Sequence, residues 1–194
     1  MKFDELNQLK ERFAEFPEEE REKRVSLATK LGEALEYVFA LIVVEQKAKI
    51  NKEPSDYYDL LALRFGDIFD EEDLSYEDET LHDMAQDVVD VTFKHIDEPR
   101  YTSKERAAEL AEDETYSAFA FEEFIEAVNA GKKHKTWVSK NDEKVRLNHE
   151  DVDMLTIPIN EYFQVGEDRM RFPHDYINGS PANIAYCRCL CFYS

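Results

Sequence analysis

The spacing of apolar residues along the first 130 residues predicts helices. In the clearest stretch, apolar side chains recur every three or four positions, the repeat of one helix face. These residues are Val25, Leu27, Leu31, Leu35, Val38, Phe39 and Ile42. The later turns of this stretch are apolar almost all round, a pattern typical of a helix buried among other helices. We expect this helix to be among the longest in the protein.

Two shorter helices and a solvated connection are predicted around it. An N-terminal helix carries Phe3, Leu6, Leu9 and Phe13 on one face and ends near Phe16. Its continuation is blocked because Pro17 lacks a backbone N–H and clashes with the preceding turn. Pro54 opens the second helix, which we expect to end in the acidic stretch 67–73. That charge run is interpreted as a solvated connection.

Two further helices complete the expected helical region. Ser75 is expected to cap a helix that ends before Pro99, because a residue that precedes proline avoids the helical conformation. The segment from Thr102 to Glu105 fits a capping box, in which the threonine hydroxyl and the glutamate carboxylate each accept a backbone N–H. Gly131 can adopt the left-handed conformation that ends a helix. The sequence therefore predicts a helix over residues 103–130.

Beyond Gly131 the pattern changes to short extended segments. They fall at residues 136–138, 157–159, 163–165 and 186–192, with a short polar helix expected over 143–153. The predicted fold class is α+β, a helical N-terminal region followed by a small C-terminal domain with a short helix and a few antiparallel strands. We place an acidic helical region at 1–101 and the small domain at 102–194.

Composition limits the partners that this chain can have. The 194 residues carry a formal net charge of -20, and the first 97 hold 26 acidic and 12 basic side chains. Such charge repels a nucleic-acid backbone unless basic groups gather in a patch. The longest apolar run, residues 37–44, is too short to cross a bilayer, so no membrane partner is expected. The first six residues include Lys2, Asp4 and Glu5 where a signal peptide is apolar, which predicts a cytoplasmic product.

The C-terminal third carries a series of motif residues in a characteristic order. They are Lys135, Trp137, Asp142, Arg146, His149, Asp153, Pro158, Phe172, Pro173, Asp175, Cys187, Arg188 and Cys189. In this order they resemble the motif blocks of the phage Mu F-type head-morphogenesis domain. The segment 106–115 is similar to the helix that precedes this domain in many members, so the resemblance covers roughly residues 106–191.

The chain departs from the family's pattern at two positions. Members commonly have Gly where this chain has Met154, and Asn where it has Tyr186. A glycine allows a positive φ that methionine tolerates poorly.

The resemblance implies a structural role in a virus particle. It points to a minor head, or capsid, protein that acts in head morphogenesis and is neither an enzyme nor dependent on a cofactor. The implied partners are the phage portal, scaffold or major capsid proteins, with contact to packaged DNA as a further possibility. The implied locations are the bacterial host cytoplasm during assembly and then the interior of the virion head.

Asp142, Arg146 and His149 offer an alternative, enzymatic interpretation. Arg146 and His149 are three residues apart on a predicted helix, and Asp142 lies just before its start, so the three side chains can share a surface. A toxin-like RNase would use such a cluster for acid–base catalysis. We favour structural roles, in which Asp142 caps the helix, Arg146 pairs with a carboxylate and His149 makes a buried hydrogen bond.

The three cysteines, Cys187, Cys189 and Cys191, alternate along a predicted strand and would face one side of it. A metal site is one interpretation, with His149 or His174 completing the ligand set. Ligands one residue apart on a strand close a compact zinc site with difficulty, since the usual spacing is two to four residues. We therefore expect the cysteines to pack as small hydrophobic side chains on a core face.

The acidic N-terminal region leaves a third alternative open. Its helices would act as a nucleic-acid mimic that inhibits a host DNA-binding factor. Acidic helical faces are usually solvated surfaces that keep a protein soluble, so the charge by itself is weak support for mimicry.

Overall fold

The computed structural model describes residues 11–76 and 78–194. The predicted N-terminal helix face with Phe3, Leu6 and Leu9 lies outside the described residues, while Phe13 is buried. The chain forms two compact units, Met1–Thr115 and Tyr116–Ser194. The first is helical and the second contains the sheets, which confirms the predicted α+β class.

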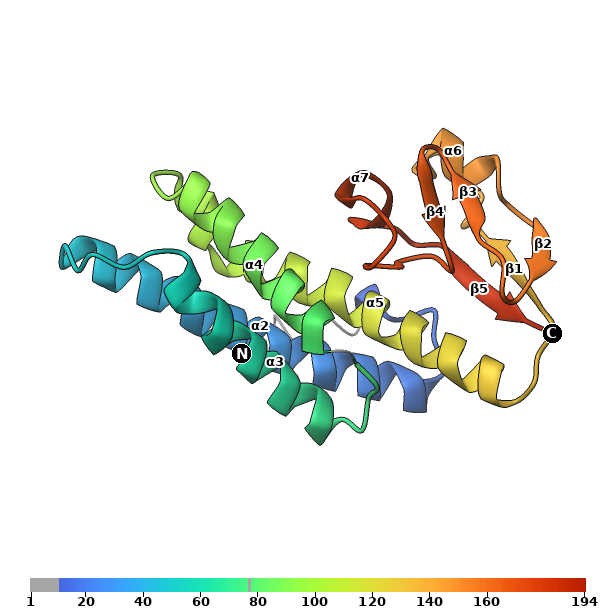
Figure 1. Cartoon of the computed structure of the whole chain (residues 1–194), viewed down its shortest axis with the longest axis horizontal. Coiled ribbons are helices and arrows are strands. Elements are labelled where there is room, and N and C mark those ends of the chain that lie inside the picture. Colours follow the sequence, from blue (N-terminus) through green and yellow to red (C-terminus); the bar gives the residue numbers. More distant parts are fainter. Residues whose placement is uncertain (1–10, 77) are drawn as a thin grey trace. The chain divides into compact units, whose positions relative to one another are not determined.

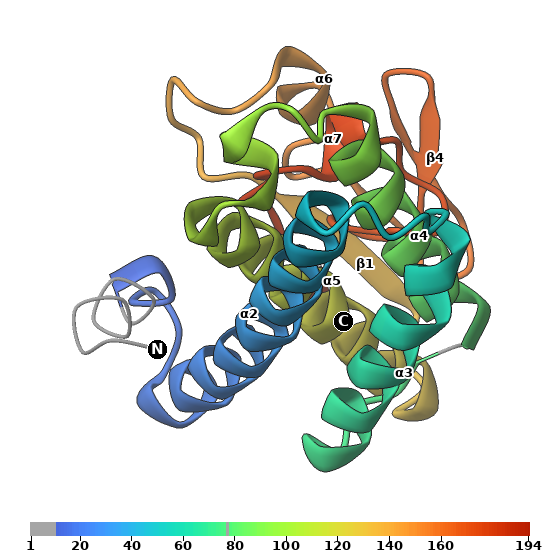
Figure 2. The ribbon, with the colours of Figure 1, turned by 90° about the vertical axis from the view of Figure 1, so that its left-hand side faces the viewer.

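The first unit is built from long helices (Figure 1). They are α2 (Glu18–Lys47), α3 (Ser55–Glu71), α4 (Asp78–Lys94), the 3-10 helix η1 (Pro99–Thr102) and the first half of α5 (Lys104–Asn129). Helix α3 packs against both α2 and α4, and the three lie side by side in Figure 2. None of the helices in the described part of the chain is long and apolar enough to cross a membrane.

Helix α2 buries the apolar face that its sequence predicts. All seven of the predicted apolar positions are buried, from Val25 to Ile42. Pro17 stands at the N-cap, as expected from its missing N–H. The same face also buries Arg24, whose guanidinium pairs with Glu20 at 2.7 Å and lies 3.8 Å from the centre of the Phe16 ring. This cation is stabilised because it has both an acidic partner and an aromatic face.

Two helix boundaries differ from their predictions. The expected solvated connection at 67–73 is wrong, because α3 continues to Glu71 with Phe65 and Phe69 buried on its inner face. Burial of these rings outweighs the acidic residues between them. The predicted capping box is also displaced by one residue. Ser103 Oγ accepts the N–H of Arg106 at 3.2 Å, while Thr102 lies in η1.

The second unit contains two small antiparallel sheets. Strand β1 (His134–Val138) is central in the first, between β2 (Thr156–Pro158) and β5 (Leu190–Tyr193). The second pairs β3 (Phe163–Val165) with β4 (Asp168–Met170). The predicted extended segments at 136–138, 157–159 and 163–165 all lie in or next to strands, and the α5 terminator Gly131 has a φ of 73°.

Other elements of this unit are shorter than predicted, or were not predicted. The expected helix over 143–153 is reduced to α6 (Leu147–Glu150), and the expected strand over 186–192 begins only at Leu190. Strand β4 and the short helix α7 (Pro181–Ile184) were not predicted. Each of these elements has only three or four residues, too few for a periodic pattern to be visible in the sequence.

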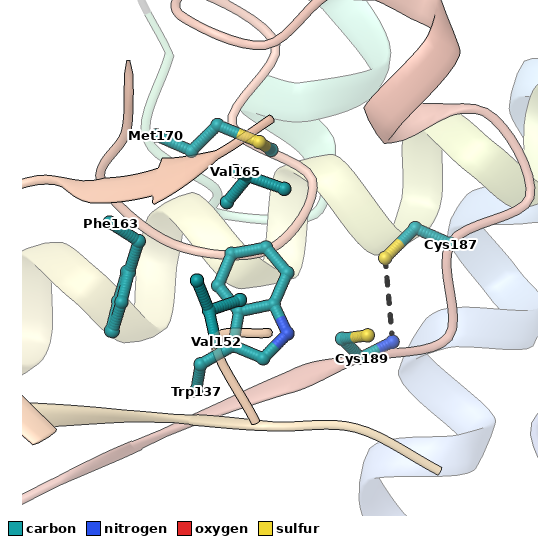
Figure 3. Close-up of a cluster of buried hydrophobic side chains, with 7 residues drawn as sticks. All are labelled: Trp137, Val152, Phe163, Val165, Met170, Cys187 and Cys189. Atoms are coloured by element: carbon teal, nitrogen blue, oxygen red, sulfur yellow. Dashed lines mark hydrogen bonds between the residues drawn. The ribbon is translucent and has the colours of Figure 1, made fainter. Parts of the chain in front are cut away.

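A compact core joins the two sheets of this unit (Figure 3). Its buried members are Trp137, Val152, Phe163, Val165, Met170, Cys187 and Cys189. The rings of Trp137 and Phe163 meet edge to face, with centroids 5.4 Å apart. A fully buried side chain of this size contributes about 1.5–3 kcal/mol to the free energy of folding, so this cluster is the main source of the unit's stability.

Four non-glycine residues of this unit are in the left-handed conformation, namely Asn141, Met154, His174 and Tyr186. The second and the fourth stand where the sequence departs from the family motif. Met154 has a φ of 57° and Tyr186 a φ of 55°. The turn at Met154 is fixed because the Met154 N–H donates to the Trp137 carbonyl at 2.8 Å. A left-handed residue with a Cβ atom costs roughly 1–2 kcal/mol, so each of these turns carries strain that the surrounding core compensates.

Replacing Met154 by glycine should relieve this strain. The Met154 side chain is 67% exposed and contributes little packing. We expect Met154→Gly to raise the free energy of unfolding by about 0.5–1 kcal/mol, the strain removed less the entropy that glycine loses on folding. Urea denaturation followed by circular dichroism measures the change. Met154→Ala is the control, since it keeps the Cβ atom, and an equal gain in that variant would contradict the explanation.

Among the described residues of the first unit, one carboxyl group is buried, that of Glu114. Glu114 on α5 is 6% exposed, and its Oε2 has no hydrogen-bond partner within the described residues. Burial, together with the charges of Asp113 and Asp87, raises the pKa of Glu114 to about 8. The folded protein therefore keeps this carboxyl protonated at neutral pH.

This carboxyl makes stability depend on pH. Between pH 4.5 and 8 the folded state holds a proton that the unfolded state releases, so stability falls as pH rises through this window. We expect Glu114→Gln to stabilise the protein at pH 8 by about 2–4 kcal/mol and to flatten the decline. Thermal unfolding at a series of pH values tests this. Glu22→Gln removes an exposed carboxylate and should leave the decline in place, and an unchanged decline in Glu114→Gln would refute the assignment.

Candidate functional site

Three side chains from distant parts of the sequence converge inside the second unit. The Nδ1 atom of His149 lies 3.5 Å from the sulfur of Cys189 and 3.7 Å from the sulfur of Cys187. The three candidate ligand atoms all lie within 4.8 Å of one another. Each residue is at most 3% exposed. The cluster is therefore a buried arrangement of two sulfurs around one ring nitrogen.

Helix α6 and strand β1 hold His149 in place. The imidazole meets the Trp137 ring edge to face, with centroids 5.3 Å apart. Arg146, at the N-cap of α6, donates a hydrogen bond to the carbonyl of Ala185. This bond ties α6 to the segment that leads into Cys187. The Trp137 ring and the bond from Arg146 to Ala185 therefore fix the histidine ring in the position where it contacts both sulfurs.

A tight turn brings the two sulfurs together. In an extended strand, side chains two residues apart are separated by about 6.6 Å. Here the left-handed Tyr186 precedes Cys187, the Cys187 N–H donates to the carbonyl of Ile184 at 3.1 Å, and β5 begins only at Leu190. The Cys189 N–H donates to the Cys187 sulfur at 3.4 Å (Figure 3). The turn replaces the predicted strand geometry at these positions.

The surroundings of the two thiols change their pKa values. The neighbouring Cys187 thiol lowers the pKa of Cys189 to about 5, and His149 acts in the same direction against the effect of burial. The same contact with Cys189, together with burial, raises the pKa of Cys187 well above its usual range. One contact between the two sulfurs therefore shifts their pKa values in opposite directions.

A small polar pocket lies against this cluster. Its lining includes the cluster residues His149 and Cys189, and the rest is mainly basic. The other lining residues are Lys140, Lys144, Val145, Arg146, Tyr186 and Arg188. The pocket has room for about one water molecule. The basic residues that line it are Lys140, Lys144, Arg146 and Arg188.

Asp142 and Arg188 form the main ion pair near the pocket. The two Arg188 nitrogens donate to the two Asp142 oxygens at 2.7 and 2.8 Å. This pairing lowers the pKa of Asp142 to about 2, with the backbone N–H of Lys144 contributing. Two predicted interactions are therefore wrong. Asp142 closes a turn and does not cap α6, and Arg146 binds a backbone carbonyl and not a carboxylate.

The other motif positions stabilise the same unit. Asp153 accepts the N–H of Ser139 at 2.6 Å, and Pro158 ends β2. Phe172 and Pro173 are buried, with the Phe172 ring 5.1 Å from that of Phe124. Lys135 is fully buried, with its ammonium group 5.3 Å from the centre of the Phe124 ring and 5.5 Å from that of Phe163. Burial lowers the pKa of Lys135 to about 8.

The remaining ligand candidates lie elsewhere. His174 stacks on the Tyr116 ring at 5.0 Å and is not part of the cluster around His149. Cys191 lies on β5 opposite Trp137, outside the group, and burial raises the pKa of its thiol to about 11. Of the predicted ligand set, the structure brings together only His149, Cys187 and Cys189.

A hydrogen-bond network that the sequence did not reveal supports the turn. Asp168 accepts bonds from the Ser180 N–H and hydroxyl and from the Asn183 amide, at 2.6–2.7 Å. The Asn183 amide also donates to the carbonyl of Val165 at 3.1 Å. This network ties β3 and β4 to α7, which leads into the cysteine turn. Serine followed by Pro181 at a helix start is a signal that predicts α7.

No protein-family model, curated protein or solved structure matches this chain.

Asp175 gives a direct test of how the motif residues stabilise this unit. It is fully buried and accepts bonds from the backbone and guanidinium of Arg171 at 2.7–3.0 Å and from Asn178 at 2.9 Å. Breaking a buried ion pair leaves the partner charge uncompensated. We expect Asp175→Asn to lower the free energy of unfolding by about 3 kcal/mol. Chemical denaturation measures it.

The control for this prediction is Asp151→Asn, which removes an exposed carboxylate near α6. Its effect should stay within about 0.5 kcal/mol. Similar losses in both variants would show that Asp175 is not a structural anchor.

Proposed function

We propose that this protein is a phage minor head protein that acts in head morphogenesis. The observation that carries the proposal is the backbone conformation at the two positions where the sequence departs from the family motif. Members commonly have Gly where this chain has Met154 and Asn where it has Tyr186, and both positions are left-handed. Gly and Asn are the residues that adopt this conformation most readily.

The φ values themselves are independent of the residue order on which the resemblance rests. The resemblance rests on residue types and their order, and neither of these specifies the backbone angle φ. Only six non-glycine residues of the described chain have a positive φ, so two substituted positions would seldom both be among them if the resemblance had arisen by chance. The chain thus retains a backbone suited to Gly and Asn after both have been replaced.

The positions of the motif residues give further support. Trp137, His149, Cys187 and Cys189 pack together in the core, and Asp142 and Arg188 pair beside them. Residues that a family maintains for a fold are expected to contact one another in this way.

The proposed role is structural. We infer that the portal, scaffold or major capsid proteins are its partners, first in the host cytoplasm and then inside the head. Packaged DNA would be contacted through the basic residues around the pocket, since the net charge of -20 opposes approach by other surfaces. No cofactor is needed for this role.

The geometry gives the enzymatic alternative less support. The imidazole of His149 is 1% exposed and faces two sulfurs, and Asp142 is neutralised by Arg188. A general acid or base must reach the proton that it transfers, and neither group is placed to do so. The mimic alternative rests only on the acidic charge of the first unit.

The composition of purified particles tests the proposal. A tagged full-length chain would be expressed during induction of the phage that encodes it, and procapsids and mature heads would be separated on a gradient. We expect mass spectrometry to find the chain in the heads at low copy number and crosslinking to join it to the portal or scaffold. Its absence from both kinds of particle would contradict the proposal.

Two controls make the result specific. Met154→Gly should enter heads like the wild type, because it retains the fold, whereas Asp175→Asn should enter less well if the second unit is required. Purified full-length chain should also leave RNA intact. RNA cleavage that disappears in a folded His149→Ala variant would favour the RNase alternative over the structural role.

A further inference from the structure

We propose that His149, Cys187 and Cys189 bind one zinc ion, with a water molecule from the adjoining pocket as the fourth ligand. This inference concerns a site for which the sequence favoured simple packing, and it does not depend on the proposed role in head assembly. It rests on the positions of the ligand atoms, on their chemistry and on the pocket beside them.

The distances match those of a tetrahedral zinc site. Zinc lies about 2.3 Å from a cysteine sulfur and about 2.0–2.1 Å from a histidine nitrogen, so a tetrahedral sulfur–nitrogen edge is about 3.6 Å. The two sulfur–nitrogen distances here are 3.5 and 3.7 Å. All three ligand atoms lie within 4.8 Å of one another. An ion can therefore be accommodated with little movement of the side chains.

The ligand types favour zinc over harder ions. Two thiolates and an imidazole are the soft and borderline donors that zinc binds, while magnesium and calcium prefer oxygen. Two thiolates also neutralise a divalent ion, so burying the loaded site adds no net charge. The Cys189 N–H bond to the Cys187 sulfur would stabilise that thiolate and orient it as an outer hydrogen bond does at other metal sites.

The turn removes the objection raised by the sequence spacing. Cysteines one residue apart on a strand cannot easily reach the same ion, because their side chains are too far apart. The left-handed Tyr186 and the start of β5 at Leu190 place Cys187 and Cys189 outside the strand. Their sulfurs then approach the same nitrogen of His149.

A nucleophilic cysteine is the main alternative for such a cluster. A cysteine–histidine pair needs one thiolate beside the imidazole and access for a substrate. Here two sulfurs approach one nitrogen, and all three residues are at most 3% exposed. The second sulfur can serve as a further metal ligand, whereas the buried sulfurs leave no room for a substrate.

The pocket supplies the fourth position. His149 and Cys189 both line it, and it has room for about one water molecule. Zinc sites with three protein ligands keep such an open position for water. The basic lining, which includes Lys140, Arg146 and Arg188, favours a water that has lost a proton or a small anion in its place.

Metal binding by the purified full-length chain tests the proposal. Protein in reducing buffer would be stripped with a chelator and titrated with zinc, and with cobalt as a spectroscopic probe. We expect one ion per chain and, with cobalt, a thiolate charge-transfer band and the visible bands of a tetrahedral ion. Cys187→Ser, Cys189→Ser and His149→Ala should each weaken binding by at least about tenfold.

Cys191→Ser is the matched control. It removes a neighbouring thiol that lies outside the cluster, so it should bind zinc and cobalt like the wild type. Thermal unfolding with and without chelator separates binding from folding. Chelation should lower the melting temperature of the wild type and Cys191→Ser, and should leave that of Cys189→Ser unchanged.

Three results would overturn the proposal. One is metal uptake by the wild type far below one ion per chain. Another is a cobalt complex that lacks the thiolate band. The last is loss of binding in Cys191→Ser equal to that in Cys189→Ser, which would place the ion elsewhere or make it adventitious.

Discussion

The second unit depends on the packing of His149 between the Trp137 ring and the sulfurs of Cys187 and Cys189. Its strands contain only three to five residues, and sheets of this size bury too little apolar surface to be stable through pairing alone. The central cluster joins strand, helix and turn at one point. The Arg146 bond to Ala185 and the Asp168 network hold these segments in register around it.

The need to bring strand, helix and turn together around His149 also explains the strained turns. Met154 and Tyr186 stand where β1 must bond to the segment before β2 and where the chain must turn into Cys187. A left-handed residue allows the chain to reverse direction within a short turn, and packing of the core compensates for its cost of roughly 1–2 kcal/mol. The backbone is therefore more constrained than the residue types at these positions suggest. This constraint also brings the two cysteines to one histidine.

The helical unit follows a simpler rule. Its helices bury continuous apolar faces, and its acidic groups are mostly outside, with Glu114 as the clear exception. Even there, the burial of a carboxyl group is accommodated by protonation and not by a new contact. In this unit the apolar pattern controls where helices run. In α3 the apolar pattern extends the helix to Glu71, past acidic residues that in the sequence resemble a loop.

The sequence by itself determined the α+β class, the buried face of α2, the extent of α5 and the strand segments near Trp137 and Phe163, because these depend on periodic apolar positions. It also indicated the motif residues, through their order. Tertiary structure alone decided that Asp142 pairs with Arg188, that Arg146 binds a carbonyl, and that Cys187 and Cys189 converge on His149 while Cys191 does not. These contacts join residues about 40 positions apart, and local periodicity contains no information about distances across such a separation.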